Sequence, residues 1–154
     1  MGTTLCLLRH GRATGQGPNA KLLPEGEASV AALGRRLARE GLPTALAFSS
    51  PYLRAMETAR IVLAEAAPGL RAETLEELVP ECDPNDTIAA LAARDLPAAR
   101  VLVVAHLPLL ALVAQKLARE VVAFSPGTLA EIEMDESWSR GRLQRVIGPE
   151  EAAD

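Results

Sequence analysis

The sequence predicts an α/β fold, a three-layer αβα sandwich with a mostly parallel central sheet. Strand and helix signals alternate along the whole chain, which is typical of helices packed on both faces of such a sheet. Apolar runs at residues 3–8 and 101–105 lack polar alternation, as in parallel strands buried on both faces. The chain has two histidines, His10 and His106, and each follows one of these runs. Because ligands of open α/β sheets bind beyond the carboxyl ends of strands, both histidines are candidate site residues.

Composition indicates a soluble globular protein. The 154 residues are expected to form one domain, 1–154, with 23% charged and 49% hydrophobic residues. A net charge of −4 argues against a nucleic-acid-binding surface. The most apolar stretch, 101–114, is interrupted by His106 and Pro108 and is shorter than the roughly 20 residues of a membrane span. No basic region precedes the first strand, so we expect a cytoplasmic location, with no membrane or nucleic-acid partner.

The first half of the chain predicts two strand–helix pairs. After the first strand and a glycine-rich loop, apolar residues at helical spacing predict a helix over 24–40, which Gly41 ends. A second strand is predicted over 45–49. Ser50 and Pro51 are then expected as the N-cap and first residue of a helix that runs to residue 66.

The second half continues the alternation. A short third strand is predicted over 70–75, and Asp83 is expected to cap a helix that runs to residue 94. The buried strand at 101–105 and a helix over 108–118 follow.

The C-terminal part predicts two edge strands or a hairpin, at 128–134 and 141–147, and then a frayed tail at 148–154. The two cysteines, Cys6 and Cys82, have neither disulfide-framework nor zinc-site spacing. Cys6 is expected to be a small buried hydrophobic residue.

The triplet Arg9-His10-Gly11 has the chemistry needed to bind and attack a phosphoryl group. An arginine fork holds two phosphate oxygens, a neighbouring imidazole nitrogen can attack phosphorus, and glycine lets the backbone approach an anion. The alternative is a strand-end histidine satisfied by a carbonyl, beside a surface arginine.

Two further strand-to-helix junctions carry side chains that can also bind a phosphoryl group, namely Arg54 and His106. Arg54 lies about one turn into the predicted second helix, where it can reach back to an anion at the helix N-terminus. His106 can donate a hydrogen bond to a phosphoryl oxygen during in-line transfer. Arg54 alone is more typical of a solvated helix position, but three junctions with these residues in this order favour a phosphoryl-binding site.

Taken in order, these segments resemble the histidine phosphatase superfamily, also called phosphoglycerate mutase-like. The resemblance extends over residues 4–130 and rests on Arg9-His10-Gly11, on Ser50-Pro51-x-x-Arg54-Ala55-x-x-Thr58-Ala59 and on His106. Within the family, the chain is most similar to the short bacterial SixA-type phosphohistidine phosphatases. They share a Leu-x-Glu-Leu-x-Pro segment, here 75–80, and a His-Leu-Pro-Leu segment, here 106–109.

This resemblance implies that His10 is the nucleophile and forms a phosphohistidine, while Arg9, Arg54 and His106 bind the phosphoryl group and stabilise its transition state. Water would then attack the phosphohistidine and release inorganic phosphate. His10 must attack as neutral imidazole, and adjacent arginines disfavour its protonation. No metal or other cofactor is expected, because the arginines and His106 supply positive charge.

Glu77 is the candidate proton donor, because it corresponds to the glutamate of the Leu-x-Glu-Leu-x-Pro segment and larger relatives use a carboxylate after the third strand. Glu76 and Glu81 are neighbours, and an exposed acidic loop is the alternative interpretation. A labile phosphoramidate substrate would depend less on acid catalysis.

Two positions depart from the family pattern. Arg12 follows the Arg-His-Gly triplet, where relatives often carry an acidic or amide residue. Its positive charge favours binding of an acidic partner or of a second anionic group. The alternative is a side chain that faces solvent. The segment 22–26 lacks the threonine that caps the first helix in relatives, so this helix should begin less firmly.

The resemblance predicts a phosphatase that acts on phosphohistidine in a protein. The short segment between Leu75 and Arg100 leaves little room for a lid, so an open site is expected, which suits a phosphate displayed on another protein. Small phosphomonoesters are the alternative substrates. A non-catalytic module that binds phosphate or a phosphoprotein is the second hypothesis, and phosphate turnover distinguishes it from an enzyme.

Overall fold

The computed structural model describes residues 2–154, which contain a six-stranded sheet. Its strands are β1 (Thr4–Arg9), β2 (Thr44–Ser49), β3 (Glu73–Thr74), β4 (Arg100–Ala105), β5 (Leu129–Met134) and β6 (Gly141–Ile147). They lie in the order β3-β2-β4-β1-β5-β6. The first four of these are parallel, whereas β5 is antiparallel to β1 and β6 is antiparallel to β5. The predicted mostly parallel sheet is therefore confirmed.

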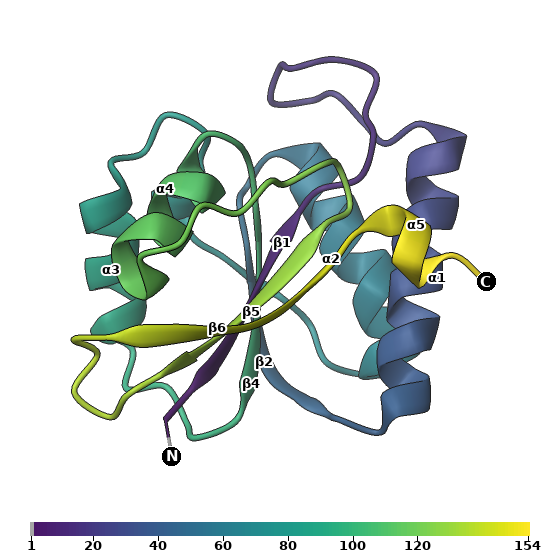
Figure 1. Cartoon of the computed structure of the whole chain (residues 1–154). Helices are drawn as coiled ribbons and strands as arrows, with labels where there is room; N and C mark the ends of the chain where they lie inside the picture. The colour runs from purple at the N-terminus through teal and green to yellow at the C-terminus, as the bar shows by residue number, and fades with distance from the viewer. Residues whose placement is uncertain (1) are drawn as a thin grey trace.

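Helices cover both faces of this sheet. They are α1 (Pro24–Glu40), α2 (Leu53–Ala66), α3 (Pro84–Ala92), α4 (Leu109–Ala118) and the short α5 (Pro149–Ala152), with a 3₁₀ turn, η1 (Glu76–Leu78), after β3. α1, α2 and α5 lie on one face and α3 and α4 on the other (Figure 1). This is the predicted three-layer αβα sandwich.

Strand β1 shows why its sequence lacks polar alternation. Leu5 and Leu7 point into the core beneath α3 and α4, while Cys6 and Leu8 point into the core beneath α1 and α2. All four are at most 2% exposed. Burial raises the pKa of the Cys6 thiol to about 12, so this side chain acts as the small hydrophobic residue that the sequence indicated.

The first helix has the predicted bounds and the predicted weak start. Its N-cap, Leu23, makes no side-chain hydrogen bond, and Pro24 occupies the first turn. Gly41 ends the helix with φ of 68°, a left-handed conformation that glycine adopts without steric cost.

The predicted start of the second helix is wrong. Helix α2 begins at Leu53, not at Pro51, and its N-cap is Tyr52. The Ser50 hydroxyl accepts a hydrogen bond from the Tyr52 N–H and also contacts His106, so it belongs to a tertiary contact. Arg54 is therefore the second helical residue and lies in the first turn.

Three expectations near strand and chain ends also need correction. Only Glu73–Thr74 of the predicted third strand pairs with β2. The hairpin alternative at 128–134 and 141–147 is confirmed, because β5 and β6 pair antiparallel, but β5 is not an edge strand, because it also pairs with β1. The tail is not frayed, because residues 149–152 form α5, Ala152 is 1% exposed and Asp154 forms an ion pair with Arg35.

A buried ion-pair cluster fixes the inner strand β5 to its surroundings. The Glu131 carboxylate is 5% exposed and lies 2.6 Å from the Arg100 guanidinium and 2.8 Å from that of Arg145. Arg145 also pairs with Glu40 at the end of α1, at 2.6 Å. These arginines lower the pKa of Glu131 against the opposing effect of burial. The cluster links β4, β5 and β6 to α1.

Substituting Glu131 by Ala is expected to lower the free energy of unfolding by about 3–5 kcal/mol, because Arg100, whose side chain is only 13% exposed, would lose its carboxylate partner. Glu133→Ala is the matched control, since Glu133 lies on the same strand but pairs with an Arg142 side chain that is 76% exposed. We expect the control to cost less than about 1 kcal/mol. Urea denaturation measures both, and equal losses would contradict the role of burial.

Within residues 2–154, no helix combines the length and apolarity needed to cross a bilayer.

Candidate active site

Three strand-to-helix junctions meet at the carboxyl edge of the parallel strands and surround one cavity of about 720 Å³. The loop after β1 rises above this edge of the sheet (Figure 1). Four of the five residues predicted from the sequence line the cavity: Arg9, His10, Arg54 and His106. Polar and charged side chains that share this lining include Arg12, Gln16, Glu25, Tyr52 and Glu81.

Both ring nitrogens of His10 have defined partners. Nδ1 lies 2.7 Å from the Gly11 carbonyl oxygen, which can only accept, so Nδ1 carries the proton. Nε2 then has the free electron pair and accepts a hydrogen bond from Arg54 Nε at 3.2 Å. His10 is therefore held with its unprotonated nitrogen directed toward a cation.

Gly11 is required for close packing next to His10. A Cβ at this position would lie 2.9 Å from the carbonyl oxygen of Gly26 in α1 and 3.1 Å from Val30 Cγ1. Its N–H donates to Thr58 Oγ1 in α2 at 3.1 Å. The glycine thus lets the loop after β1 lie against α1, a different reason from the anion approach that the sequence suggested.

The two arginines are fixed by backbone carbonyls. Arg54, only 5% exposed, donates from Nη1 to Gly17 O at 2.8 Å, and its guanidinium lies 5.1 Å from the centre of the Tyr52 ring. Arg9 donates from Nη1 to Phe124 O at 2.8 Å, and its buried Nε has no partner within residues 2–154. Each guanidinium keeps N–H groups that an anion in the cavity could use.

His106 faces His10 across the site, with ring centres 5.1 Å apart. Its Nε2 lies 2.7 Å from Ser50 Oγ, and the Tyr52 ring packs edge-on against it. Its buried Nδ1 has no hydrogen-bond partner in the described part of the chain. Buried polar atoms without partners are rare in folded proteins, and a ligand bound in the cavity is one group that could supply this partner.

Both histidines are neutral at physiological pH. Burial is the largest cause, and it lowers the pKa of His10 to about 4 and that of His106 to about 3. The charges of Arg54 and Arg9 lower both values further, while the Gly11 hydrogen bond partly opposes the shift at His10. The sequence had indicated the arginines as the cause, but burial has the larger effect.

Neither histidine is expected to titrate near pH 6.5 in the folded protein. Since both pKa values are lowered, protonation requires a more acidic solution, with midpoints near pH 4 for His10 and pH 3 for His106. An NMR titration of the imidazole Cε1–H signals measures this directly, because the chain has only two histidines. Urea-denatured protein is the control, with midpoints near about 6.5. A folded-state midpoint above 6 would contradict the expectation.

Glu77 does not line the cavity. It lies in η1 and borders a separate surface hollow with Glu76, Cys82 and Asp86. Glu81, which the sequence presented only as a neighbour, lines the cavity together with Pro80, in the turn that follows η1. Arg12 also lines it. The lining of this cavity thus includes Glu81 and not Glu77, and the role of Glu77 as proton donor stays a prediction.

Ser50, Tyr52 and Thr58 contact the site through hydrogen bonds or ring packing but were not predicted as site residues. Ser50 and Thr58 belong to the segment 50–59, on which the resemblance to the family rests. Their place in that segment was the signal in the sequence that could have indicated a role at the site. No pattern in the sequence indicated Tyr52.

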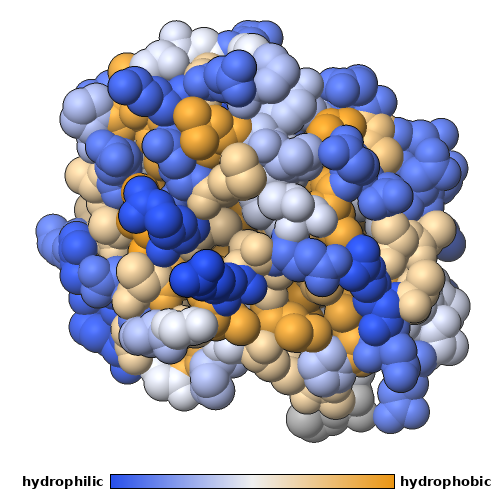
Figure 2. All heavy atoms as spheres, turned by 180° about the vertical axis from the view of Figure 1, so that it is seen from behind, coloured by the Kyte–Doolittle hydropathy of each residue, from blue (hydrophilic) through white to orange (hydrophobic). Residues whose placement is uncertain are grey.

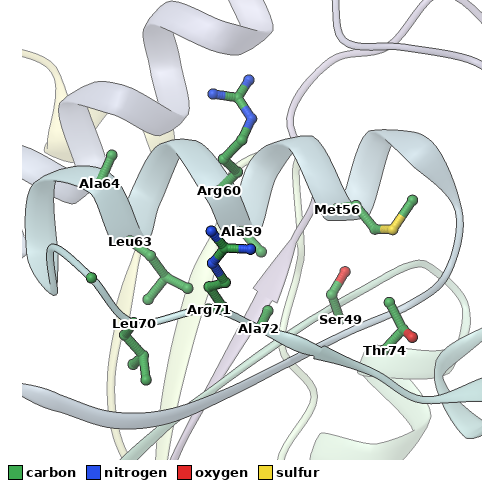
Figure 3. Close-up of a pocket in the computed structure, with 11 residues that line it drawn as sticks. Ser49, Met56, Ala59, Arg60, Leu63, Ala64, Leu70, Arg71, Ala72 and Thr74 are labelled. Atoms are coloured by element: carbon green, nitrogen blue, oxygen red, sulfur yellow. The ribbon is translucent and has the colours of Figure 1, made fainter.

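A second hollow, of about 520 Å³, lies between α2 and the chain leading to β3 (Figure 3). Leu63, Leu70 and Ala59 line its floor, and Arg60 and Arg71 flank it (Figure 3). It contains no histidine. The face of the molecule in Figure 2 shows hydrophobic surface interrupted by charged side chains. The paired imidazoles distinguish the first cavity as the candidate active site.

No group of three or more His, Cys, Asp or Glu side chains in residues 2–154 is arranged to bind a metal ion. Among these residues, the cationic side chains that line the cavity with the two imidazoles are those of Arg9, Arg54 and Arg12.

The architecture is that of the phosphoglycerate mutase-like class of α/β proteins. Residues 5–83 match the model of the histidine phosphatase superfamily, branch 1, and the chain belongs to that family.

Solved structures extend the similarity over nearly the whole chain. The protein histidine phosphatase SixA in complex with tungstate is 26% identical, with a TM-score of 0.87 over 95% of this chain and 97% of that one. A protein from Agrobacterium tumefaciens assigned as the phosphohistidine phosphatase SixA is 20% identical, with a TM-score of 0.80 over 97% and 99%. A phosphoglycerate mutase from Bacillus anthracis is 18% identical, with a TM-score of 0.74 over 97% and 95%. A search of curated protein sequences gave no significant match. Family membership and these structures together support phosphatase activity.

Proposed function

We propose that this protein is a phosphatase that works through a phosphohistidine on His10 and removes phosphate from phosphohistidine in another protein. The observation that carries the proposal is the tautomer of His10. Its Nδ1 proton is bound by Gly11 O, so Nε2 is unprotonated and lies among the arginines of the cavity. Its low pKa keeps this nitrogen nucleophilic throughout the physiological range.

In the first step, His10 Nε2 attacks the phosphorus atom in line with the leaving group. The new P–Nε2 bond forms as the bond to the leaving nitrogen or oxygen breaks, and the leaving group takes a proton from solvent or, when it is an alkoxide, from the carboxyl group of Glu81. In the free protein, Arg54 Nε–H donates a hydrogen bond to His10 Nε2. During the reaction the same N–H donates to a phosphoryl oxygen instead. Arg9 and His106 donate to the other equatorial oxygens and stabilise their charge in the transition state.

In the second step, a water molecule attacks the phosphorus of the phosphohistidine. The P–Nε2 bond breaks, inorganic phosphate leaves with the proton of the water, and His10 returns to its neutral form. The arginines act on the same equatorial oxygens in both steps, and no metal takes part in either.

Glu81 is the proposed proton donor for phosphomonoesters, in place of Glu77. An alkoxide leaving group needs a proton more than an imidazole does, so Glu81→Gln should slow phosphomonoester turnover by about 100-fold and phosphohistidine turnover less. Glu77→Gln is the matched control and should leave both rates unchanged. Steady-state kinetics on the two substrates provide the measurement, and the reverse pattern between Glu81 and Glu77 would contradict the assignment.

The substrate class is supported by the similarity to SixA and by the exposed Arg12 at the cavity, which suits an acidic phosphoprotein. A reducing cytoplasm is the proposed setting, because Cys6 and Cys82 are both free. Small phosphomonoesters are the second candidate class, since a cavity of about 720 Å³ also accommodates a small molecule.

Phosphate release by the purified protein in the presence of a chelator tests the proposal. The substrates are a histidine-phosphorylated carrier protein and a panel of phosphomonoesters, with His10→Ala alongside. Faster turnover of the phosphoprotein supports the proposed substrate, while preference for one small ester assigns the protein to that metabolite. Turnover lost with the chelator would refute metal independence, and saturable phosphate binding without turnover would indicate a binding module.

A further inference from the structure

Ser50 occupies a position in the site that the phosphatase chemistry above does not use. Ser50 follows β2 directly and is 0% exposed. Its hydroxyl oxygen lies 2.7 Å from His106 Nε2. The same oxygen accepts a hydrogen bond from the Tyr52 backbone N–H at 3.1 Å. Ser50 is thus the polar contact of the second imidazole, 56 positions away in the sequence.

The direction of the Ser50–His106 hydrogen bond follows from counting donors and acceptors. A serine hydroxyl has one proton to donate and two electron pairs to accept with. One pair is used by the Tyr52 N–H, and solvent does not reach the side chain. Within residues 2–154, His106 Nε2 is the nitrogen or oxygen atom placed to receive the Ser50 proton.

The opposite direction leaves two buried groups unsatisfied. If His106 were protonated on Nε2, the Ser50 proton would have no acceptor, and His106 Nδ1 would be a buried acceptor with no donor. If Ser50 donates to Nε2, only the Nδ1–H of His106 lacks a partner, and a phosphoryl oxygen is the acceptor that it needs. Since His106 is neutral at physiological pH, it must choose one of these two tautomers.

We infer that Ser50 is a positioning residue that holds His106 in the Nδ1-protonated tautomer and so presents an N–H donor to the phosphoryl group. The role of that donor in turnover rests on the proposed function, whereas the tautomer itself belongs to the resting protein. The two catalytic imidazoles are then fixed in the same tautomer by different neighbours, His10 by a carbonyl and His106 by a hydroxyl.

Nitrogen-15 NMR on the labelled, ligand-free protein tests the inference, because long-range correlations to the ring protons distinguish the two tautomers. The chain has only two histidines, and the His10→Gln variant leaves His106 as the sole signal for assignment. We expect His106 to carry its proton on Nδ1 in the wild type and to shift largely to Nε2 in Ser50→Ala. Ser50→Thr, which keeps the hydroxyl, should restore the wild-type spectrum.

Turnover gives a second readout. Ser50→Ala should lower kcat by about 10- to 100-fold, the usual cost of losing a partner that orients a functional histidine. Ser50→Thr should recover most of this loss. Ser49→Ala is the matched control, because Ser49 is equally buried and its hydroxyl donates to the Ser50 carbonyl without touching His106. It should leave the tautomer unchanged.

A wild-type His106 protonated on Nε2 would overturn the inference, as would a Ser50→Ala protein that keeps the Nδ1 tautomer. If Ser50→Ala does not fold, Ser50→Cys replaces it, since a thiol is a weak donor. An Nδ1-protonated His106 in a protein without phosphatase turnover would refute the proposed function and leave the Ser50 assignment intact.

Discussion

Replacing His10 by Ala is expected to lower phosphatase turnover by at least about 10⁴-fold, because the variant lacks the imidazole on which we propose that the covalent intermediate forms. The fold should survive, since His10 lies at the end of β1 and its contacts are confined to the site. Rates of phosphate release for wild type and variant, with thermal melts as a folding check, give the measurement.

Trapping the intermediate makes this test specific. Quenching the wild-type protein during turnover of a labelled substrate should yield an acid-labile, base-stable phosphoenzyme, and His10→Ala should yield none. Because the chain contains only His10 and His106, peptide mapping assigns the label to one of two positions. Label on His106, or turnover that persists in His10→Ala, would contradict the proposed nucleophile.

Replacing Arg54 by Ala is expected to lower kcat/KM by about 10²- to 10³-fold. The buried guanidinium donates to His10 Nε2 in the free protein, and in the proposed mechanism it holds the phosphoryl oxygens in the transition state. Arg54→Lys should recover little, because an ammonium group keeps the charge but lacks the planar fork. Steady-state kinetics on the substrate with the highest turnover provide the measurement.

Arg60→Ala is the matched control for Arg54. Arg60 lies on the same helix, α2, but is exposed and borders the other hollow (Figure 3). This variant removes the same charge from the same helix and should leave kcat/KM unchanged. Equal losses for Arg54→Ala and Arg60→Ala would show that general electrostatic attraction, and not a placed donor, carries the effect.

The sequence predicted the elements whose signals are local. Apolar spacing and Gly41 defined α1 from Pro24 to Glu40, because helix periodicity and a left-handed C-cap depend on adjacent residues. Asp83 was correctly predicted as the N-cap of α3, and its carboxylate accepts the Asn85 N–H at 2.8 Å.

Predictions failed where a side chain had competing partners far away in the sequence. Ser50 carries the usual signal of an N-cap, yet its hydroxyl contacts His106, and α2 begins later. The tail at 148–154 has a short, charged sequence, yet α5 is held by the ion pair of Arg35 with Asp154 and by a hydrogen bond from Arg36 to Glu151 O at 3.0 Å. Neither contact leaves a periodic pattern in the sequence.

The features of the candidate site also fall into two groups, those predicted from the sequence and those that only the tertiary structure shows. The sequence by itself determined the αβα sandwich and the grouping of Arg9, His10, Arg54 and His106, because parallel strands bring their carboxyl ends to one edge of the sheet. Only the tertiary structure decided that Glu81 and not Glu77 reaches the cavity, that Ser50 contacts His106, and that burial is the main cause of the low histidine pKa values. These depend on the direction of individual side chains and on solvent exclusion, which arise when distant segments pack together.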